Sequence, residues 1–212
     1  MRLQPIMVSL QGKKVVVIGG GPVAERKIRM ALDCGAFVSV ISPELTEGLT
    51  DLALDHKFIH LKREYRNGDL AGANFAFAAI DDPDVSREIA ADADKRNILL
   101  NVVDQPDHCS FIVPAVVRRG RLTLAVSTGG ASPALARNIK NRLAGEFGDE
   151  YIRLLDALAE IREFCMQKIP DPIRRREILL QMADDTLLEL ARSHNRLALE
   201  KELLRRITNE ME

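Results

Sequence analysis

A run of three glycines directly after a short β-branched stretch constrains this chain more than any other feature of its sequence. The stretch Lys14–Ile18 reads Lys-Val-Val-Val-Ile, which is typical of a strand buried on both faces of a parallel sheet. Glycines occupy positions 19–21, and the following Pro22 is favoured at the first position of a helix. The pattern therefore predicts a strand, a tight glycine turn and a helix from Pro22 to about Cys34.

Strand-like and helix-like segments continue to alternate through the first 113 residues. Short apolar runs alternate with stretches that carry helix caps, such as Asp82 followed by Pro83. Repeated units of this kind predict an open parallel sheet with helices on both faces. The further strands are expected at 37–41, 58–62, 75–79 and 98–103, and the further helices at 45–55 and 83–96.

The rhythm changes after Val113. Two strands are expected at 114–118 and 122–127, followed by a helix from Pro133 to about Phe147. Beyond residue 148 leucines recur at helical spacing in a heavily charged background, with breaks expected at the prolines 170 and 172 and at 193–195. Three domains are therefore expected: an α/β sheet domain at 1–113, a small α+β region at 114–147 and an all-helical C-terminal domain at 148–212.

Composition excludes several classes of partner. The chain is 46% hydrophobic and 29% charged with a net charge of −1, which argues against broad nucleic-acid or membrane-surface binding. No apolar run approaches the roughly 18 residues of a membrane span. Cys34, Cys109 and Cys165 form neither a CxxC pair nor a disulfide framework, which fits a reducing compartment. We therefore expect a cytoplasmic protein without a nucleic-acid or membrane partner.

The glycine turn has the GxGxxA spacing of a dinucleotide-binding loop. Gly19 permits the tight turn, Gly21 lets a pyrophosphate approach the helix N-terminus, and Ala24 lets helix and strand pack closely. We expect Gly19, Gly21, Pro22 and Val23 to bind the cofactor. The alternative is a strand-to-helix turn that binds nothing.

An acidic residue roughly 20 positions further on usually contacts the adenosine ribose. Glu44 is the only candidate at the end of the second expected strand, and the backbone around Pro43 is the alternative contact. No arginine stands there to receive a 2′-phosphate, so the sequence favours NAD over NADP.

Asp104 closes the fifth expected strand. Ligands of open α/β sheets lie at the carboxyl ends of the strands, so this carboxylate is expected to face the cofactor crevice. An aspartate in a loop also often serves only as a turn or cap residue, and position alone leaves both roles open.

Four motifs together resemble one known family. They are Gly19–Lys27 (Gly-Gly-Gly-Pro-Val-Ala-Glu-Arg-Lys), Asn101–Asp104 (Asn-Val-Val-Asp), Ser110–Ala115 (Ser-Phe-Ile-Val-Pro-Ala) and Ala125–Pro133 (Ala-Val-Ser-Thr-Gly-Gly-Ala-Ser-Pro). In this order they resemble the precorrin-2 dehydrogenase/sirohydrochlorin ferrochelatase family, the N-terminal module of siroheme synthase. The family's fold, a Rossmann domain, a dimerisation region and a helical domain, agrees with the division expected from the pattern.

The resemblance implies oxidation of precorrin-2 to sirohydrochlorin by NAD⁺, with Asp104 as the general base. A positioned base suits both this step and metal insertion, because each removes a proton from the macrocycle. Some members also insert ferrous iron into the product. The sequence does not decide whether this chain inserts iron or cobalt, or whether it serves the siroheme or the cobalamin route. A homodimer formed through 114–147 is also implied. The chain ends at Glu212 without an extension that would carry a methyltransferase, so methylation is expected from another protein.

The acetate and propionate arms of such a substrate call for cationic and backbone donors. Arg118 and Arg137 are the chosen candidates from a basic cluster for which a solvated face is the alternative. The loop residues Ser127, Thr128 and Gly129 precede a helix N-terminus and are expected to form an anion site. Family members can carry a phosphoserine in this loop, so either hydroxyl is a candidate for phosphorylation. The full cluster is Arg118, Arg119, Arg121, Arg137, Lys140 and Arg142.

His108 and Cys109 follow Asp104 closely, but two donors do not make a closed metal site, so no resident metal is expected. Transient handling of iron by Asp104 and His108 stays open.

Two other functions compete with the dehydrogenase: a nucleotide-sensing regulatory module, and another NAD enzyme on the same fold. Absorbance of the protein incubated with precorrin-2 and NAD⁺ separates all three.

Overall fold

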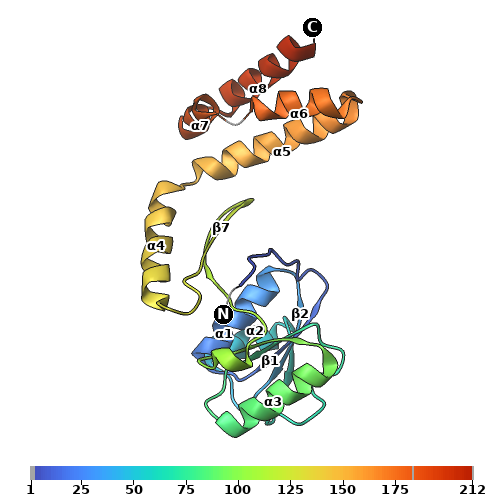
Figure 1. Ribbon diagram of the computed structural model, residues 1–212, viewed down its shortest axis with the longest axis vertical. Coiled ribbons are helices and arrows are strands. Elements are labelled where there is room, and N and C mark those ends of the chain that lie inside the picture. The colour runs from blue at the N-terminus through green and yellow to red at the C-terminus, as the bar shows by residue number, and fades with distance from the viewer. Residues whose placement is uncertain (1–2, 183, 212) are drawn as a thin grey trace. The chain divides into compact units, whose positions relative to one another are not determined.

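The computed structural model describes residues 3–182 and 184–211 (Figure 1). The chain divides into two compact units, of which the first ends at Val113 and the second begins at Pro114. In the described part of the chain, no helix is both long and apolar enough to cross a bilayer.

The first unit is built on a five-stranded parallel sheet in the order β3-β2-β1-β4-β5. This arrangement confirms the Rossmann-type fold expected from the sequence. From β1 the chain adds β2 and β3 on one side of the sheet, and it then returns to add β4 and β5 on the other side of β1. The point between β1 and β4, where the order of strand addition changes, is the switch point at which such sheets bind ligands. The strands are β1 (Lys14–Ile18), β2 (Phe37–Ile41), β3 (Ile59–Leu61), β4 (Phe75–Ala78) and β5 (Leu99–Val102).

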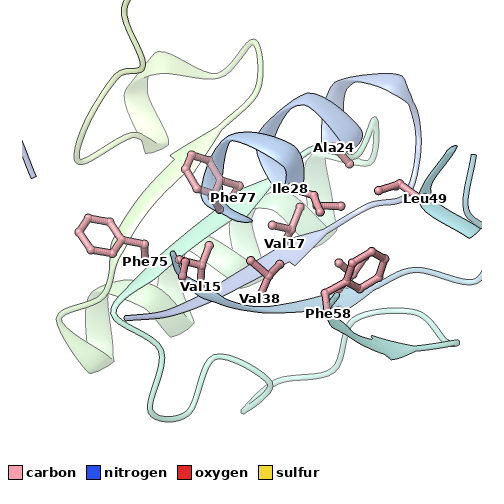
Figure 2. Packing of buried hydrophobic residues seen from close by; sticks show 12 residues of the cluster. Val15, Val17, Ala24, Ile28, Val38, Leu49, Phe58, Phe75 and Phe77 are labelled. Atoms are coloured by element: carbon pink, nitrogen blue, oxygen red, sulfur yellow. The ribbon is translucent and has the colours of Figure 1, made fainter. Parts of the chain in front are cut away.

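Helices cover both faces of this sheet because its strands are apolar on both sides. On one face Ala24 and Ile28 of α1 (Pro22–Asp33) pack with Val17, as Figure 2 shows, together with Leu49 of α2 (Glu47–Leu54). The other face carries the neighbouring strand residues, among them Val16 and Ile18, beneath α3 (Pro83–Arg96). Alternate residues of β1 therefore serve two separate cores, as the unbroken valine run predicts.

The second unit combines a hairpin with five helices in its described part. β6 (Ala115–Arg119) pairs with β7 (Leu122–Val126) in antiparallel fashion, and Gly120 at φ +54° forms the turn. Ser132 caps α4 by accepting from the Leu135 N–H at 3.2 Å. A separate core of leucine and isoleucine side chains holds the last four helices together. The helices are α4 (Pro133–Glu146), α5 (Glu150–Lys168), α6 (Pro172–Leu180), α7 (Asp185–Arg192) and α8 (Arg196–Met211).

The structure differs from the expected elements mainly at their ends. The helix expected at 45–55 begins at Glu47, because Thr46 is its cap and accepts from the Leu49 N–H. An unexpected break separates α6 from α7, where Asp184 caps the new helix by accepting from the Leu187 N–H. A short 3₁₀ helix, η1 (Pro106–His108), also follows β5. The last residue of the expected helical run, Glu212, lies outside the described residues.

Candidate dinucleotide site

The glycine turn joins the carboxyl end of β1 to the N-terminus of α1. Gly19 has φ +112°, and a Cβ there would lie 2.2 Å from the Ala79 carbonyl oxygen. A Cβ on Gly20 would lie 2.0 Å from the Glu44 carbonyl oxygen, so packing within the protein requires glycine at both positions. Gly21 differs, because a Cβ there meets no heavy atom within 4 Å.

Gly21 is the N-cap of α1 and provides no side-chain hydrogen bond to the helix. Pro22 brings no N–H, so the first N–H that this end offers belongs to Val23. The open space before Gly21 thus lies at the positive end of a twelve-residue helix. This geometry fits an anionic group such as a pyrophosphate.

An open pocket of about 450 Å³ lies beside the turn, where β1 and β2 end. Its lining includes Pro43 and Glu44, the expected ribose contacts, and Glu44 is exposed. Ser42 donates a hydrogen bond from Oγ to the Glu44 carbonyl oxygen at 2.6 Å and so fixes the loop. The full lining is Gly20, Gly21, Ser42, Pro43, Glu44, Leu45 and Thr46.

Thr46 and Glu25 join the pocket loop to the glycine turn, and the sequence analysis assigned neither of them. The Thr46 N–H donates to the Gly20 carbonyl oxygen at 2.9 Å, and Thr46 Oγ1 donates to Glu25 Oε2 at 2.6 Å. Hydrogen bonds from Thr46 and Arg29 hold the pKa of the Glu25 carboxyl below its ordinary value. The available signal was the cap pattern at Thr46, but its link to Gly20 depends on contacts distant in sequence.

Asp104 stands at the carboxyl edge, two residues beyond the end of β5. Its φ is +59°, a conformation that aspartate and asparagine tolerate better than most residues. The side chain is exposed, and among the described residues no group donates a hydrogen bond to its carboxylate. A cap or turn role would require such a bond, so this geometry favours the alternative in which the carboxylate is available to a ligand.

The loop around Asp104 is held by its neighbours instead. Buried Asn101 donates from Nδ2 to the Phe111 carbonyl oxygen at 3.0 Å, and the Leu100 N–H donates to Ser110 Oγ at 2.7 Å. The Cys109 sulfur accepts from the Val102 N–H at 3.2 Å. In the described part of the chain, no group of three or more His, Cys, Asp or Glu side chains is placed to hold a metal ion.

The substrate-binding candidates belong to the second unit. In the loop before α4, Thr128 Oγ1 donates to the Ser132 carbonyl oxygen at 3.0 Å, and Ser127 Oγ accepts from the Gly129 N–H at 3.1 Å. Ser127 is exposed, whereas Thr128 is half-buried. Arg118 on β6 and Arg137 on α4 are both exposed.

Two other members of the basic cluster hold the second unit together. Arg119 donates from Nη2 to the Ala144 carbonyl oxygen at 3.0 Å, and Arg121 pairs with Asp156 at 3.1 Å. The structure therefore groups Gly19, Gly21, Pro22, Val23, Pro43, Glu44 and Asp104 in the first unit, and Arg118, Ser127, Thr128, Gly129 and Arg137 in the second.

Comparison with known proteins assigns families to most of the first 146 residues. A family described as putative NAD(P)-binding matches residues 6–115, which is just over half of the chain. A family described as sirohaem biosynthesis protein, central, matches residues 119–146. The first match covers the sheet with its glycine turn, and the second covers most of the hairpin and α4.

Similar curated proteins carry the name siroheme synthase. The protein from Methylobacillus flagellatus is 39% identical over 83% of this chain, and that from Chromobacterium violaceum is 36% identical over 98% of it. This chain spans 38% and 44% of their respective lengths. A solved structure named SirC, precorrin-2 dehydrogenase, is similar over 98% of this chain and 100% of its own, with a TM-score of 0.80 and 27% identity.

Proposed function

The chain belongs to the family described as putative NAD(P)-binding and continues into a sirohaem biosynthesis central segment, and from this premise we propose that it oxidises precorrin-2 to sirohydrochlorin with NAD⁺. The observation that carries the proposal is the likeness to a precorrin-2 dehydrogenase over 98% of the chain, a share that includes the second unit. A nucleotide-sensing module would need the glycine turn but would have no use for a ligand-accessible Asp104.

NAD is the cofactor that the pocket fits best. Its lining contains a carboxylate, Glu44, and neither lysine nor arginine, so a 2′-phosphate would meet a negative charge without a compensating cation. The free space at Gly21 and the Val23 N–H suit the pyrophosphate, and the loop at Pro43 and Glu44 suits the ribose. We expect NAD⁺ to bind at least roughly ten-fold more tightly than NADP⁺, which calorimetry with both dinucleotides measures.

The oxidation removes one hydride and one proton from the reduced macrocycle. When bound, the nicotinamide accepts the hydride. Asp104 accepts the proton at its carboxylate, to which no group among the described residues donates a hydrogen bond. The same carboxylate would take a pyrrole N–H proton during insertion of ferrous iron, which we propose as a second activity with iron as a substrate.

The second unit supplies the substrate contacts and the dimer in this proposal. The exposed residues Arg118 and Arg137 bind the acetate and propionate arms, and the loop at Ser127, Thr128 and Gly129 binds a further carboxylate, with the exposed Ser127 hydroxyl as a donor. The segment 114–147 forms the homodimer. A hairpin and one helix bury little apolar surface on their own, which favours a partner copy.

The deciding experiment follows absorbance anaerobically after the protein is mixed with precorrin-2 and NAD⁺. Sirohydrochlorin and NADH should appear together in equal amounts. NAD⁺ binding without any change in precorrin-2 would favour the sensing module, and oxidation of a different substrate would favour another enzyme on this fold. Addition of Fe²⁺ to sirohydrochlorin under the same conditions tests the iron insertion separately.

A further inference from the structure

Lys27 ends the Gly19–Lys27 motif, and neither the cofactor pocket nor the proposed base accounts for it. It lies on the second turn of α1 and is half-buried. Its ammonium nitrogen is 5.5 Å from the centre of the Phe77 ring, and Phe77 is only 1% exposed. Phe111 packs edge-on against Phe77, with ring centres 5.5 Å apart. The ammonium group therefore lies over aromatic side chains on the face of the sheet that α1 covers.

The charge on Lys27 has no acidic partner in the part of the chain that the structure describes. Two other cations of this unit that lie partly out of water do have one: Arg63 pairs with Asp69 at 2.6 Å, and Arg96 pairs with Asp92 at 2.7 Å. Among the described residues, no carboxylate lies within ion-pair distance of Lys27. Burial and the neighbouring Arg26 charge lower the pKa of Lys27, and the Cys109 thiol only partly opposes them.

An unpaired, partly desolvated ammonium costs folding free energy, so its presence is best explained by a group that arrives later. Phe111, which packs against the Phe77 ring, lies in the segment that also carries Asp104 and Cys109, and Cys109 is anchored to the end of β5 through the Val102 N–H. Lys27 thus lies next to the loop of the proposed base, on the β4–β5 side of the switch point.

We propose that Lys27 binds a carboxylate arm of the tetrapyrrole substrate and so orients the macrocycle toward Asp104. This inference rests on the proposed function. The chemistry agrees, because acetate and propionate arms are the anions that such a substrate brings, and a lysine ammonium forms charge-assisted hydrogen bonds with carboxylates. The cation–π contact with Phe77 holds the side chain in place until the carboxylate replaces water around the ammonium.

The test compares Lys27→Met with Lys27→Arg. Methionine keeps the apolar stem and removes the charge, so KM for precorrin-2 and the Kd for sirohydrochlorin should rise roughly 10- to 100-fold. The Kd for NAD⁺ should stay within two-fold, and arginine should restore most of the substrate affinity. Lys95→Met is the matched control, because Lys95 is exposed in the last turn of α3, and this variant should leave both constants unchanged.

The melting temperature separates binding from a purely structural role. Removal of an unpaired charge should leave it unchanged or raise it. A lower melting temperature with unchanged KM would assign Lys27 to the packing over Phe77 and overturn the inference. If Lys27→Met raised only the Kd for NAD⁺, Lys27 would be assigned to the cofactor phosphates and the inference would be overturned. If the wild-type protein neither binds nor oxidises the tetrapyrroles, the proposed function itself fails. If the wild-type protein binds and oxidises the tetrapyrroles and Lys27→Met has the same KM and Kd, only the inference about Lys27 fails.

Discussion

Asp104→Asn tests the proposed base with little disturbance of the fold. The backbone at this position has φ +59°, where asparagine is as well tolerated as aspartate, whereas alanine would add strain. The amide has nearly the same size as the carboxylate but cannot accept a proton at neutral pH. The substitution therefore isolates the proton-accepting role.

The structure sets the size of both expected effects. The Asp104 side chain is exposed and accepts no hydrogen bond among the described residues, so its change should alter the free energy of unfolding by less than about 0.5 kcal/mol. For a chain of 212 residues this is a shift in melting temperature of about 1–2 °C. Loss of a general base should lower the rate of sirohydrochlorin formation by about 10²- to 10⁴-fold.

Stopped-flow absorbance under single-turnover conditions measures this rate, and calorimetry measures NAD⁺ affinity on the same preparation. Asp107→Asn is the matched control, since Asp107 is exposed in the neighbouring η1 and undergoes the same change of charge. The control should stay within two-fold of wild type. Turnover by Asp104→Asn within ten-fold of wild type, at unchanged NAD⁺ affinity, would remove Asp104 from the mechanism.

Three further outcomes follow from the structure. Gly21→Asp should weaken NAD⁺ binding more than about 100-fold, because the new carboxylate repels the pyrophosphate, and calorimetry measures this loss. The aspartate should also cap α1 and stabilise the fold by a few tenths of a kcal/mol, which a melting curve measures. Normal NAD⁺ binding would refute the glycine-turn assignment. Sedimentation at micromolar concentration should give twice the 23.6 kDa chain mass, and a monomer would refute dimerisation through 114–147. Asp92→Asn should destabilise the fold by roughly 2 kcal/mol at pH 7. Burial raises the pKa of Asp92, but hydrogen bonds from Arg96, Tyr65 and the Gly68 N–H outweigh burial and lower the pKa. The stabilisation is therefore present at neutral pH and is lost as the pH falls below about 4. The prediction would be contradicted if variant and wild type gave the same melting curve at pH 7 as well as at pH 3.5.

Local signals made most of the fold predictable. The valine run of β1, the cap Asp82 and the prolines at helix starts each act within a few residues, and the corresponding elements form where the sequence indicates. The break before α7 was missed because Asp184 stands in a charged stretch that also suits a solvated helix surface. Its role as a cap becomes visible only in the folded bundle.

Parts of the site depend on contacts between distant segments, which the sequence does not reveal. The requirement for glycine at position 20 comes from the Glu44 carbonyl oxygen, and Thr46 reaches the turn through the Gly20 carbonyl oxygen. Lys27 becomes partly buried next to Phe77 and Phe111, which lie about 50 and 84 positions away in the chain. The spacing of the glycines predicted the turn, but these tertiary partners decide what each position tolerates.

Gly21, Asp104 and Lys27 share one property: the fold gains little from each of them. Space is open at Gly21, Asp104 adopts a left-handed conformation without a side-chain hydrogen bond in the described structure, and Lys27 keeps a charge without an acidic partner there. Gly20 and Asp92 show the opposite, because the packing of their own unit requires them. Residues that violate local preferences without a structural return are expected at functional sites. Since all three belong to the unit with the dinucleotide fold, we propose that together they mark the ligand-facing part of that unit.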